Sequence, residues 1–261
     1  MSVAVLMYHG VGDAVASHAE LRYTISEGSF ASHLDALGGR PVATYEEFLA
    51  GRATPGAVVV TFDDGEATIM TRALPLLEAR RQVAALFMTT AWIGTPGYLD
   101  ADELRELVAR GWTVGAHGHT HRYLTDADDW QLKAELHTSR DILTRILGRP
   151  PAHMSLPGGR WNSRVLAAVK EAGYLSLCNS VVALNSVRPD EFAVSRIAIL
   201  RGFDATEVVQ AADGDWRFFW KQQARKGLLD AAKRVLGNKR YNELRERVFL
   251  VRGTLRRLRG G

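Results

Sequence analysis

The chain has 261 residues, 46% of them hydrophobic, with 33 Lys and Arg against 29 Asp and Glu and a formal net charge of +4. This length and composition suffice to bury a full core in one large domain. The absence of internal repeats, low-complexity tracts and apolar runs of transmembrane length excludes a solenoid and a membrane-spanning helix. Cys178 is the only cysteine, which excludes an intrachain disulfide.

Short apolar segments alternate with amphipathic ones along most of the chain. The apolar segments predict strands at Val3–Tyr8, Ala57–Phe62, Val83–Met88, Trp112–Ala116, Ala152–Leu156, Tyr174–Cys178 and Val194–Ile199. Helical periodicity predicts helices at Ser29–Leu37, Ala67–Arg81, Asp102–Arg110, Asp128–Leu147 and Ser163–Ala172. Alternation of this kind predicts an α/β protein with a parallel sheet.

Two adjacent carboxylates follow the second predicted strand. The apolar run 57–60 leads directly into Thr61-Phe62-Asp63-Asp64-Gly65. Neighbouring side chains of a strand point to opposite faces, but Gly65 lets the chain turn, so both carboxylates can reach one cleft. Two acids in one cleft repel each other as anions, which favours a bound cation or a shared proton. The alternative is an ordinary Asx-type turn at a strand end.

A cluster of histidines follows the fourth predicted strand, in the sequence His117-Gly118-His119-Thr120-His121. On a helical turn, the four-residue spacing would place His117 and His121 on one face, where both can bind one ion. With Asp64 as the third ligand, two His and one carboxylate leave positions open for water and substrate, as in catalytic metal sites. Asp63 would then be free to accept a proton. The alternative is a polar loop with hydrogen-bonded histidines.

Five motifs together resemble those of the polysaccharide deacetylases, also called carbohydrate esterase family 4 or NodB-homology enzymes. They are Tyr8-His9-Gly10, Phe30-(x)2-His33-Leu34, Thr61-Phe62-Asp63-Asp64-Gly65, His117-(x)3-His121 and Leu156-Pro157-Gly158-Gly159. The resemblance implies a catalytic domain over residues 1–203, folded as a distorted (β/α) barrel. It also implies removal of an acetyl group from an N-acetylated amino sugar.

The resemblance assigns roles to single residues. Asp63 is expected to be the general base, and Asp64, His117 and His121 are expected to bind a divalent metal ion, with Zn²⁺ the first candidate. Substrate contacts are expected from five residues, namely His9, Pro157, Gly158, Arg160 and Arg196. His9 could instead support the site by contacting its functional residues rather than the substrate.

The chain departs from the family pattern at two places. Ser155 stands where the family has an Arg that steadies the catalytic Asp, and Arg160 is the candidate to compensate. The late His that acts as the general acid is also missing, and Arg196 occupies that segment. Arginine stays protonated in proteins, so Arg196 could hardly donate a proton. His119 and His153 are the candidates for the acid.

Residues 204–261 are expected to form a basic helical extension. From residue 215 onward there are 14 Lys and Arg against 4 Asp and Glu, a balance of +10, which leaves −6 for residues 1–214. Aromatic residues at 216–220 precede apolar residues at helical spacing, and a second helix is expected at Tyr241–Leu258. The extension is expected either to pack on the barrel or to contact an anionic membrane surface peripherally. No nucleic acid partner is expected, because no nucleic-acid module accompanies the basic segment.

A strand begins almost at residue 1 without a preceding leader pattern, so a cytoplasmic location, with peripheral membrane contact as a variant, is the expectation. Two alternatives to a sugar N-deacetylase stay open. One is a metal-dependent amidohydrolase acting on a non-sugar amide. The other is a non-catalytic carbohydrate-binding protein, which the two departures at Ser155 and Arg196 suggest.

Overall fold

The computed structural model describes residues 2–12, 16–18 and 20–224. The strands are β1 Ser2–Tyr8, β2 Val58–Asp64, β3 Ala85–Met88, β4 Thr113–Ala116, β5 His153–Ser155, β6 Ser176–Cys178, β7 Asn185–Ser186 and β8 Ile197–Ala198. The α-helices are α1 Glu27–Leu37, α2 Tyr45–Leu49, α3 Leu74–Glu78, α4 Ala101–Ala109, α5 Asp129–Leu147, α6 Ser163–Glu171 and α7 Ala205–Asp213. Shorter turns are η1 Ile69–Ala73, η2 Thr90–Trp92, η3 Leu124–Asp126 and η4 Pro157–Gly159.

The strands form one curved sheet, in the order β6-β5-β4-β3-β2-β1, and β8 and β7 both pair with β1 on its other side. All neighbours are parallel except β7, which runs antiparallel to β1. In a parallel sheet the carboxyl ends of all strands lie at one edge. That edge carries the acidic pair at the end of β2 and His117 just after β4.

The segment 191–199 joins the two edges of the sheet. At its start, Val194 N–H donates to the Leu177 carbonyl at 3.1 Å, and Asn179 N–H donates to the Val194 carbonyl at 2.9 Å. At its end, Ile199 N–H donates to the Met7 carbonyl at 2.9 Å. This segment, which we call the closing seam, links β6 to β1, so the expected distorted (β/α) barrel is confirmed.

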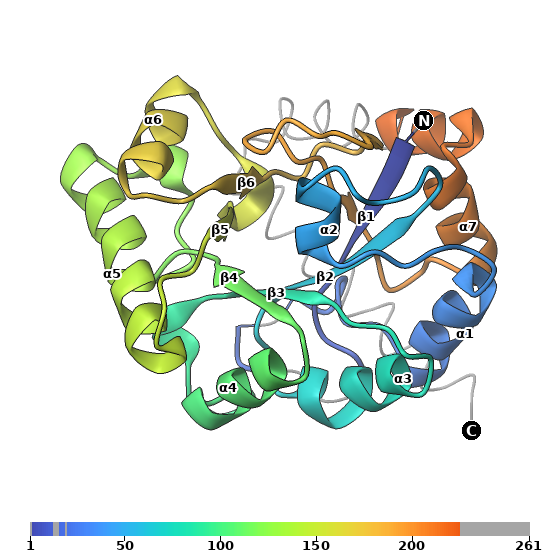
Figure 1. Ribbon diagram of the computed structural model, residues 1–261, viewed down its shortest axis with the longest axis horizontal. Helices are drawn as coiled ribbons and strands as arrows, with labels where there is room; N and C mark the ends of the chain where they lie inside the picture. The colour runs from blue at the N-terminus through green and yellow to red at the C-terminus, as the bar shows by residue number, and fades with distance from the viewer. Residues whose placement is uncertain (1, 13–15, 19, 225–261) are drawn as a thin grey trace, which may run out of the picture. The chain divides into compact units, whose positions relative to one another are not determined.

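The helices lie around the outside of the curved sheet, with α5 and α6 on one side, α3 and α4 along another, and α1 and α7 together on a third (Figure 1). The short helix α2 covers the amino end of the barrel: Tyr45 and Phe48 are 1% and 0% exposed and pack with Val3, Val5 and Val59 from the first halves of β1 and β2. The amino end is therefore filled with apolar side chains.

One predicted helix is interrupted. The stretch expected as a helix over 67–81 contains the π turn η1 followed by α3, and the Leu74 N–H donates to the Ile69 carbonyl five residues back. Pro75 has no N–H to donate to the carbonyl four residues earlier, and its ring clashes with that carbonyl. The wider π turn relieves the clash.

The chain divides into two compact units, Met1–Asp215 and Trp216–Gly261. The division falls after α7, whereas the sequence placed it at 203/204. Helix α7 begins with a capping box of Asp204 and Glu207 and packs against α1, which makes it part of the first unit. The expected tail helices beyond residue 224, including Tyr241–Leu258, lie outside the described residues.

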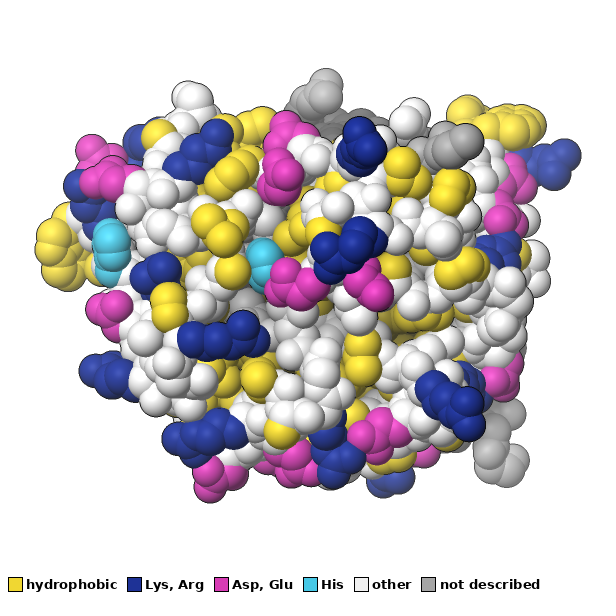
Figure 2. All heavy atoms as spheres, in the orientation of Figure 1, with side chains coloured by type: hydrophobic (Ala, Val, Ile, Leu, Met, Phe, Trp, Pro, Cys, Tyr) yellow, Lys and Arg dark blue, Asp and Glu magenta, His cyan; other side chains and the backbone are white. Residues whose placement is uncertain are grey.

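Within the described residues, every helix is too short or too polar to span a bilayer. Figure 2 shows Lys and Arg side chains interspersed with Asp and Glu over one face of the molecule.

Candidate metal centre and active site

The acidic pair lies at the carboxyl end of β2, where Asp63 and Asp64 are 2% and 7% exposed. Asp64 has φ +74°, in the left-handed region that Asp tolerates, and Gly65 follows with φ +90°. A Cβ at Gly65 would lie 2.0 Å from Met88 Sδ. The chain therefore turns sharply, as the sequence predicted, and both carboxylates face His117, whose Nε2 lies 3.7 Å from Asp63 Oδ2 and 3.6 Å from Asp64 Oδ1.

His117 and His121 lie in a loop after β4, so the expected helical turn is wrong. Left-handed residues fold this loop, with φ +78° at Gly118 and +62° at His121. His121 Nε2 lies 3.3 Å from Asp64 Oδ1, and the centroids of the two imidazole rings are 5.1 Å apart. Backbone turns, rather than helical spacing, bring the two rings to one carboxylate.

Asp64, His117 and His121 each offer a ligand atom, and these atoms all lie within 4.8 Å of one another. Asp64 Oδ1 is buried and, among the described residues, has no hydrogen-bond partner. His117 Nδ1 donates to the Ser155 carbonyl at 2.9 Å, which leaves the lone pair of Nε2 free toward the carboxylates. An unpartnered carboxylate oxygen beside two imidazole nitrogens fits a divalent cation with further positions open.

Helix turn η2 lies along the loop that carries the histidines. Its Thr90 N–H donates to the Gly118 carbonyl at 3.2 Å, and the Ala91 N–H donates to the His119 carbonyl at 2.9 Å. The His119 ring is hydrogen-bonded through Nδ1 to Thr90 Oγ1 at 2.9 Å. Trp92 places its ring 5.0 Å from that of His121. The structure thus gives His119 a contact that fixes the loop, and its expected role as the acid stays a prediction.

Glu135 of α5 holds the same loop from the other side. It is 7% exposed and accepts hydrogen bonds from the His119 N–H at 2.7 Å and the Thr120 N–H at 2.9 Å, and its second oxygen binds the Thr120 hydroxyl. The sequence analysis did not single out Glu135. The sequence did hold a signal: Glu135 stands on a face of the predicted helix 128–147 whose other buried residues are mostly apolar.

Arg196 of the closing seam pairs with Asp63 inside the barrel. Its guanidinium is fully buried and donates through Nη1 to Asp63 Oδ1 and through Nη2 to Asp63 Oδ2, each at 2.7 Å. Ser155 joins the pair: Arg196 Nη2 donates to Ser155 Oγ at 2.6 Å, and Ser155 Oγ donates to Asp63 Oδ2 at 3.1 Å. A buried bidentate pair of this kind fixes the orientation of the carboxylate.

Two expectations are corrected by this arrangement. Arg196 was expected to contact substrate, but at 0% exposure it lies behind Asp63. Arg160 was expected to compensate for Ser155, but its side chain is 54% exposed and its closest acid is Asp126, 4.0 Å away. The Arg that steadies Asp63 comes from the closing seam, just before β8, and Ser155 is hydrogen-bonded to both residues.

Burial and neighbouring charges set the ionisation of the site. Burial alone would raise the pKa of Asp63, but the Arg196 charge outweighs it and holds the pKa well below its usual range. Burial raises the pKa of Asp64 to about 6 and lowers that of His117 to about 3. Asp63 is therefore ionised at neutral pH, and His117 is neutral, as a metal ligand must be.

His9 follows β1 at the same edge of the sheet. It is 9% exposed, its ring stacks on Tyr23 with centroids 4.4 Å apart, and its Nδ1 has no hydrogen-bond partner among the described residues. Burial lowers the pKa of His9, while the charges of Asp64 and Asp63 oppose this shift. A buried imidazole with an unpartnered nitrogen, coupled electrostatically to the acidic pair, is available to the chemistry of the site.

Glu66 is a further buried acid that sequence analysis missed, although it directly follows Gly65. It is 1% exposed, and its carboxylate lies against Gly10, where a Cβ would come within 2.3 Å of Oε2. Burial, with a smaller contribution from Asp64, raises the pKa of Glu66 to about 7.

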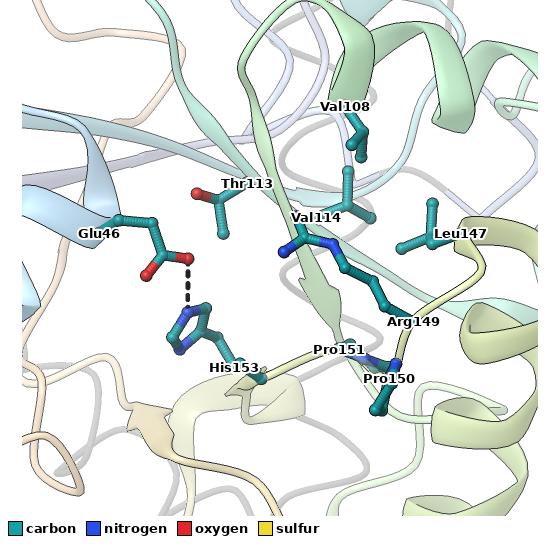
Figure 3. A pocket seen from close by; sticks show the side chains of 10 residues that line it. Glu46, Val108, Thr113, Val114, Leu147, Arg149, Pro150, Pro151 and His153 are labelled. Atoms are coloured by element: carbon teal, nitrogen blue, oxygen red, sulfur yellow. Dashed lines mark hydrogen bonds and ion pairs between the residues drawn. The ribbon is translucent and has the colours of Figure 1, made fainter.

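His153 lies at the other end of the barrel. Figure 3 shows it in a small pocket with Glu46 and Arg149, where its Nε2 donates to Glu46 Oε1 at 2.8 Å. Its Nδ1 lies 2.9 Å from Ser176 Oγ. His153 begins β5, whereas Ser155, which contacts Asp63, ends it. The expectation that His153 is the general acid is therefore wrong, because its side chain binds Glu46 and Ser176 at the amino end of the barrel.

Pro157 and Gly158 bring the loop after β5 against residues 117–121 after β4, which we call the histidine loop. Pro157 is buried, and its Cγ lies 3.5 Å from the position a Cβ would take at Gly118. Gly158 has φ +65°, and a Cβ there would lie 2.4 Å from Cε1 of Tyr123. These residues shape one wall beside the histidines, and their expected contact with substrate stays a prediction.

The fold and the site define a (β/α) barrel protein with a candidate single-ion centre at the carboxyl ends of its strands. Residues 50–177 match the sequence profile of the polysaccharide deacetylases. The chain therefore carries a domain of the polysaccharide deacetylase family.

Individual proteins agree with this assignment. The chain is 26% identical over 231 residues to the poly-β-1,6-N-acetyl-D-glucosamine N-deacetylase of Staphylococcus aureus, covering 76% of this chain and 79% of the relative. The fold matches deacetylase PplD of Streptococcus pyogenes, with a TM-score of 0.72, 21% identity, and coverage of 81% and 98% of the two chains. It also matches IcaB of Ammonifex degensii, with a TM-score of 0.68, 24% identity, and coverage of 81% and 97%.

Proposed function

We propose that this protein is a metal-dependent hydrolase that removes the N-acetyl group from an amino sugar and releases acetate. One observation carries the proposal: an ionised carboxylate, Asp63, is held by Arg196 beside the three potential ligands Asp64, His117 and His121. The name of the Staphylococcus aureus relative supports an N-acetylated sugar as the substrate class.

Asp64, His117 and His121 would hold the cation. Two imidazoles and a carboxylate suit Zn²⁺, and His117 already has its Nδ1 proton committed to the Ser155 carbonyl. When bound, such a cation supplies a Lewis acid that lowers the pKa of water and polarises a carbonyl oxygen. The remaining chemistry falls to the chain's own residues.

Asp63 accepts the proton of the water that attacks the acetamide carbonyl. Arg196 and Ser155 hold its two oxygens in place, and the Arg196 charge keeps the carboxylate ionised before the reaction. This charge also makes Asp63 a weaker base than a free carboxylate. The fixed orientation offsets that loss, because a base held in position gains from proximity.

His9 relays a proton to the leaving amine as the C–N bond breaks: its neutral imidazole takes up, at the unpartnered Nδ1, the proton that Asp63 accepted from water, and its other ring nitrogen gives one up. It joins His119 as a candidate for this proton transfer, because it is buried at the edge of the sheet that carries the acidic pair and has an unpartnered ring nitrogen. Proton transfer from His9 completes the balance: water and the amide give acetate and a free amine.

Acetate release from N-acetylglucosamine oligomers tests the proposal. The Asp63→Asn and His9→Ala proteins should keep the metal content of the wild type and lose about 10²–10⁴-fold in kcat. Asp141→Asn and His137→Ala, which change exposed residues of α5, are the matched controls and should retain activity. A thermal melt of each variant separates loss of chemistry from loss of folding. Activity of Asp63→Asn within a few-fold of the wild type would reject Asp63 as the base.

The same assay separates the two alternatives. Turnover of small non-sugar acetamides at rates above those of the sugar oligomers would favour a non-sugar amidohydrolase. Oligomer binding without acetate release by the metal-loaded wild type would favour a non-catalytic carbohydrate-binding protein. Either result would overturn the proposed N-deacetylation of sugars.

We also propose that the basic extension contacts an anionic membrane. Trp216 and Trp220, one helical turn apart, are 69% and 66% exposed in a segment of net charge +10 counted from residue 215. Aromatic residues among basic ones suit a lipid headgroup surface. Co-sedimentation with anionic vesicles should fall with added salt and with Trp216→Ala/Trp220→Ala. Unchanged vesicle binding by that double variant would reject the docking role.

A further inference from the structure

The two histidines of the candidate metal centre differ in how their rings are held. His117 Nδ1 donates to the Ser155 carbonyl, and a hydrogen bond of this kind fixes the orientation of a metal-binding imidazole. Within residues 2–12, 16–18 and 20–224, the His121 ring has no hydrogen bond through Nδ1. Its side chain is 33% exposed, and its backbone is left-handed, with φ +62°. The orientation of the His121 ring therefore depends on contacts of another kind.

Trp92, the last residue of η2, makes such a contact. The centroid of its ring lies 5.0 Å from that of His121, with 35° between the two planes. Aromatic rings at this separation attract each other, and a bulky neighbour narrows the rotation that the imidazole can make. A ring that is already oriented binds a cation without a further loss of rotational freedom. Trp92 is therefore placed to do for His121 what the Ser155 carbonyl does for His117.

His18, from the connection between β1 and α1, lies against Trp92. The His18 ring stacks on the Trp92 ring, with centroids 5.0 Å apart and 14° between the planes. The His18 N–H donates to the Tyr98 hydroxyl at 3.2 Å, and the Tyr98 ring lies 4.9 Å from that of Trp92. Because Tyr98 is buried, its hydroxyl is a fixed acceptor for His18. The Trp92 ring is thus held by two aromatic neighbours in addition to His121.

We propose that Trp92 is a positioning residue that orients the ligand His121, and that His18 acts on the candidate metal centre through Trp92 without binding the metal. We call His18, Trp92 and Tyr98 the Trp92 stack. The inference rests on the metal site of the proposed function, and it adds residues outside that site that control its affinity for the metal.

A histidine beside a metal centre could instead be a fourth ligand, and the geometry of His18 argues against this. Among the described residues, the ligand atoms that lie within 4.8 Å of one another come from Asp64, His117 and His121, and His18 is outside this group. Its ring lies nearly parallel to that of Trp92, as in stacking. A Phe can take over a stacking role, whereas it has no atom that can bind a cation.

Zn²⁺ affinity tests the role of Trp92. In competition with a chromogenic chelator, the full-chain Trp92→Ala protein should bind Zn²⁺ about 10–100-fold more weakly than the wild type, the range found when partners that orient metal ligands are lost. Trp92→Phe keeps a ring face and should recover most of the affinity, whereas Trp92→Leu, which fills space without a ring, should not. Trp130→Ala removes an exposed tryptophan of α5 and, as the matched control, should bind like the wild type.

His18 variants separate stacking from ligation. His18→Ala should weaken Zn²⁺ binding at least about threefold, and His18→Phe should restore it. Because His18 acts through Trp92, His18→Ala should cause no further loss in a Trp92→Leu background. His137→Ala, which removes an exposed histidine of α5, is the control. His18 is exposed, so its variants should fold even if a thermal melt shows that Trp92→Ala does not.

Co²⁺ gives a spectroscopic readout that does not depend on turnover. The visible absorption bands of bound Co²⁺ depend on the geometry of its ligands, so at saturating Co²⁺ they should change in Trp92→Leu and return in Trp92→Phe. Zn²⁺ affinity and Co²⁺ bands that stay unchanged in Trp92→Leu would overturn the inference, and so would an equal loss of affinity in His18→Phe and His18→Ala. The expected changes in a protein that releases no acetate would reject the proposed reaction and leave the Trp92 stack standing. A wild type that binds neither ion would overturn both.

Discussion

At the scale of single residues, the charge pair of Asp63 and Arg196 does two things at once. Arg196 is fully buried, so its charge is tolerated there because Asp63 and Ser155 accept its short hydrogen bonds and Asn179 and Thr61 accept longer ones. The same contacts fix Asp63 and keep it ionised beside the three potential metal ligands. The proposed catalytic carboxylate is therefore part of the folded core, and its substitution is expected to affect stability as well as activity.

Removing Arg196 should be costly because it leaves a buried carboxylate without its counter-charge. Arg196→Ala is expected to lower the free energy of unfolding by about 3–5 kcal/mol. The double variant Asp63→Asn/Arg196→Met, which removes both charges, should be less destabilised than Arg196→Ala alone. Urea denaturation of the three proteins checks this, and a loss below about 1 kcal/mol for Arg196→Ala would contradict a tight buried pair.

At the scale of elements, the histidine loop is held between η2 and α5. Backbone hydrogen bonds join it to η2, and Glu135 binds two of its amides. Because His121 adopts a left-handed conformation that non-glycine residues seldom adopt, the loop needs this external support to keep both imidazoles in place. Metal affinity should thus depend on residues that touch no metal.

Glu135 offers the clearest test of this support. Glu135→Ala is expected to weaken Zn²⁺ binding about 10–100-fold, the range found when residues that orient metal ligands are lost. Glu135→Gln retains an oxygen that can accept the loop amides and should keep most of the affinity. Competition with a chromogenic chelator measures both. Equal Zn²⁺ affinity in Glu135→Ala and the wild type would show that the loop keeps its conformation without Glu135.

Sequence patterns alone predicted some elements of the fold and missed others. The β-branched run before Asp63 and the spacing of the helices predicted the sheet and most of its helices, since burial imposes those patterns. The five-residue α2 and the two-residue β7 were missed, because elements that short carry no measurable periodicity. The helical turn assumed for His117 and His121 was wrong because the positive φ values of this loop leave no periodic pattern.

The partner of Asp63 illustrates a second limit. Arg196 lies 133 residues away in the chain, and only closure of the barrel by the seam brings the two together. Sequence analysis sought the compensating Arg near Ser155 and chose Arg160, because local spacing was the available guide. Contacts that depend on barrel closure have no local pattern.

At the scale of the first compact unit, Met1–Asp215, the two ends of the barrel differ in function. The carboxyl end carries the acidic pair and the histidines, and the amino end is filled by α2 and by His153, which is bonded to Glu46. Because the amino end takes no part in the proposed chemistry, changes there should alter stability and leave the site intact.

The Glu46 to His153 contact makes stability at the amino end depend on pH. The hydrogen bond from His153 lowers the pKa of Glu46, so this carboxylate contributes stability above its unfolded pKa of about 4.3 and loses it as the pH falls through the lower folded value. Glu46 is half exposed, so screening reduces the expected loss in Glu46→Gln to about 0.5 kcal/mol at pH 7. The difference from the wild type should shrink as the pH falls through the lowered folded pKa and vanish below it, whereas Glu171→Gln, an exposed control, should show little effect at any pH.

Metal removal and return test the central claim most directly. The purified protein would be treated with a chelator, dialysed, and assayed for acetate release from N-acetylglucosamine oligomers while Zn²⁺ is added back in small steps. We predict that activity disappears with the metal and returns in proportion to Zn²⁺ up to one ion per chain, whereas His117→Ala recovers none. Full acetate release by the metal-free protein, or equal recovery in His117→Ala, would contradict the account.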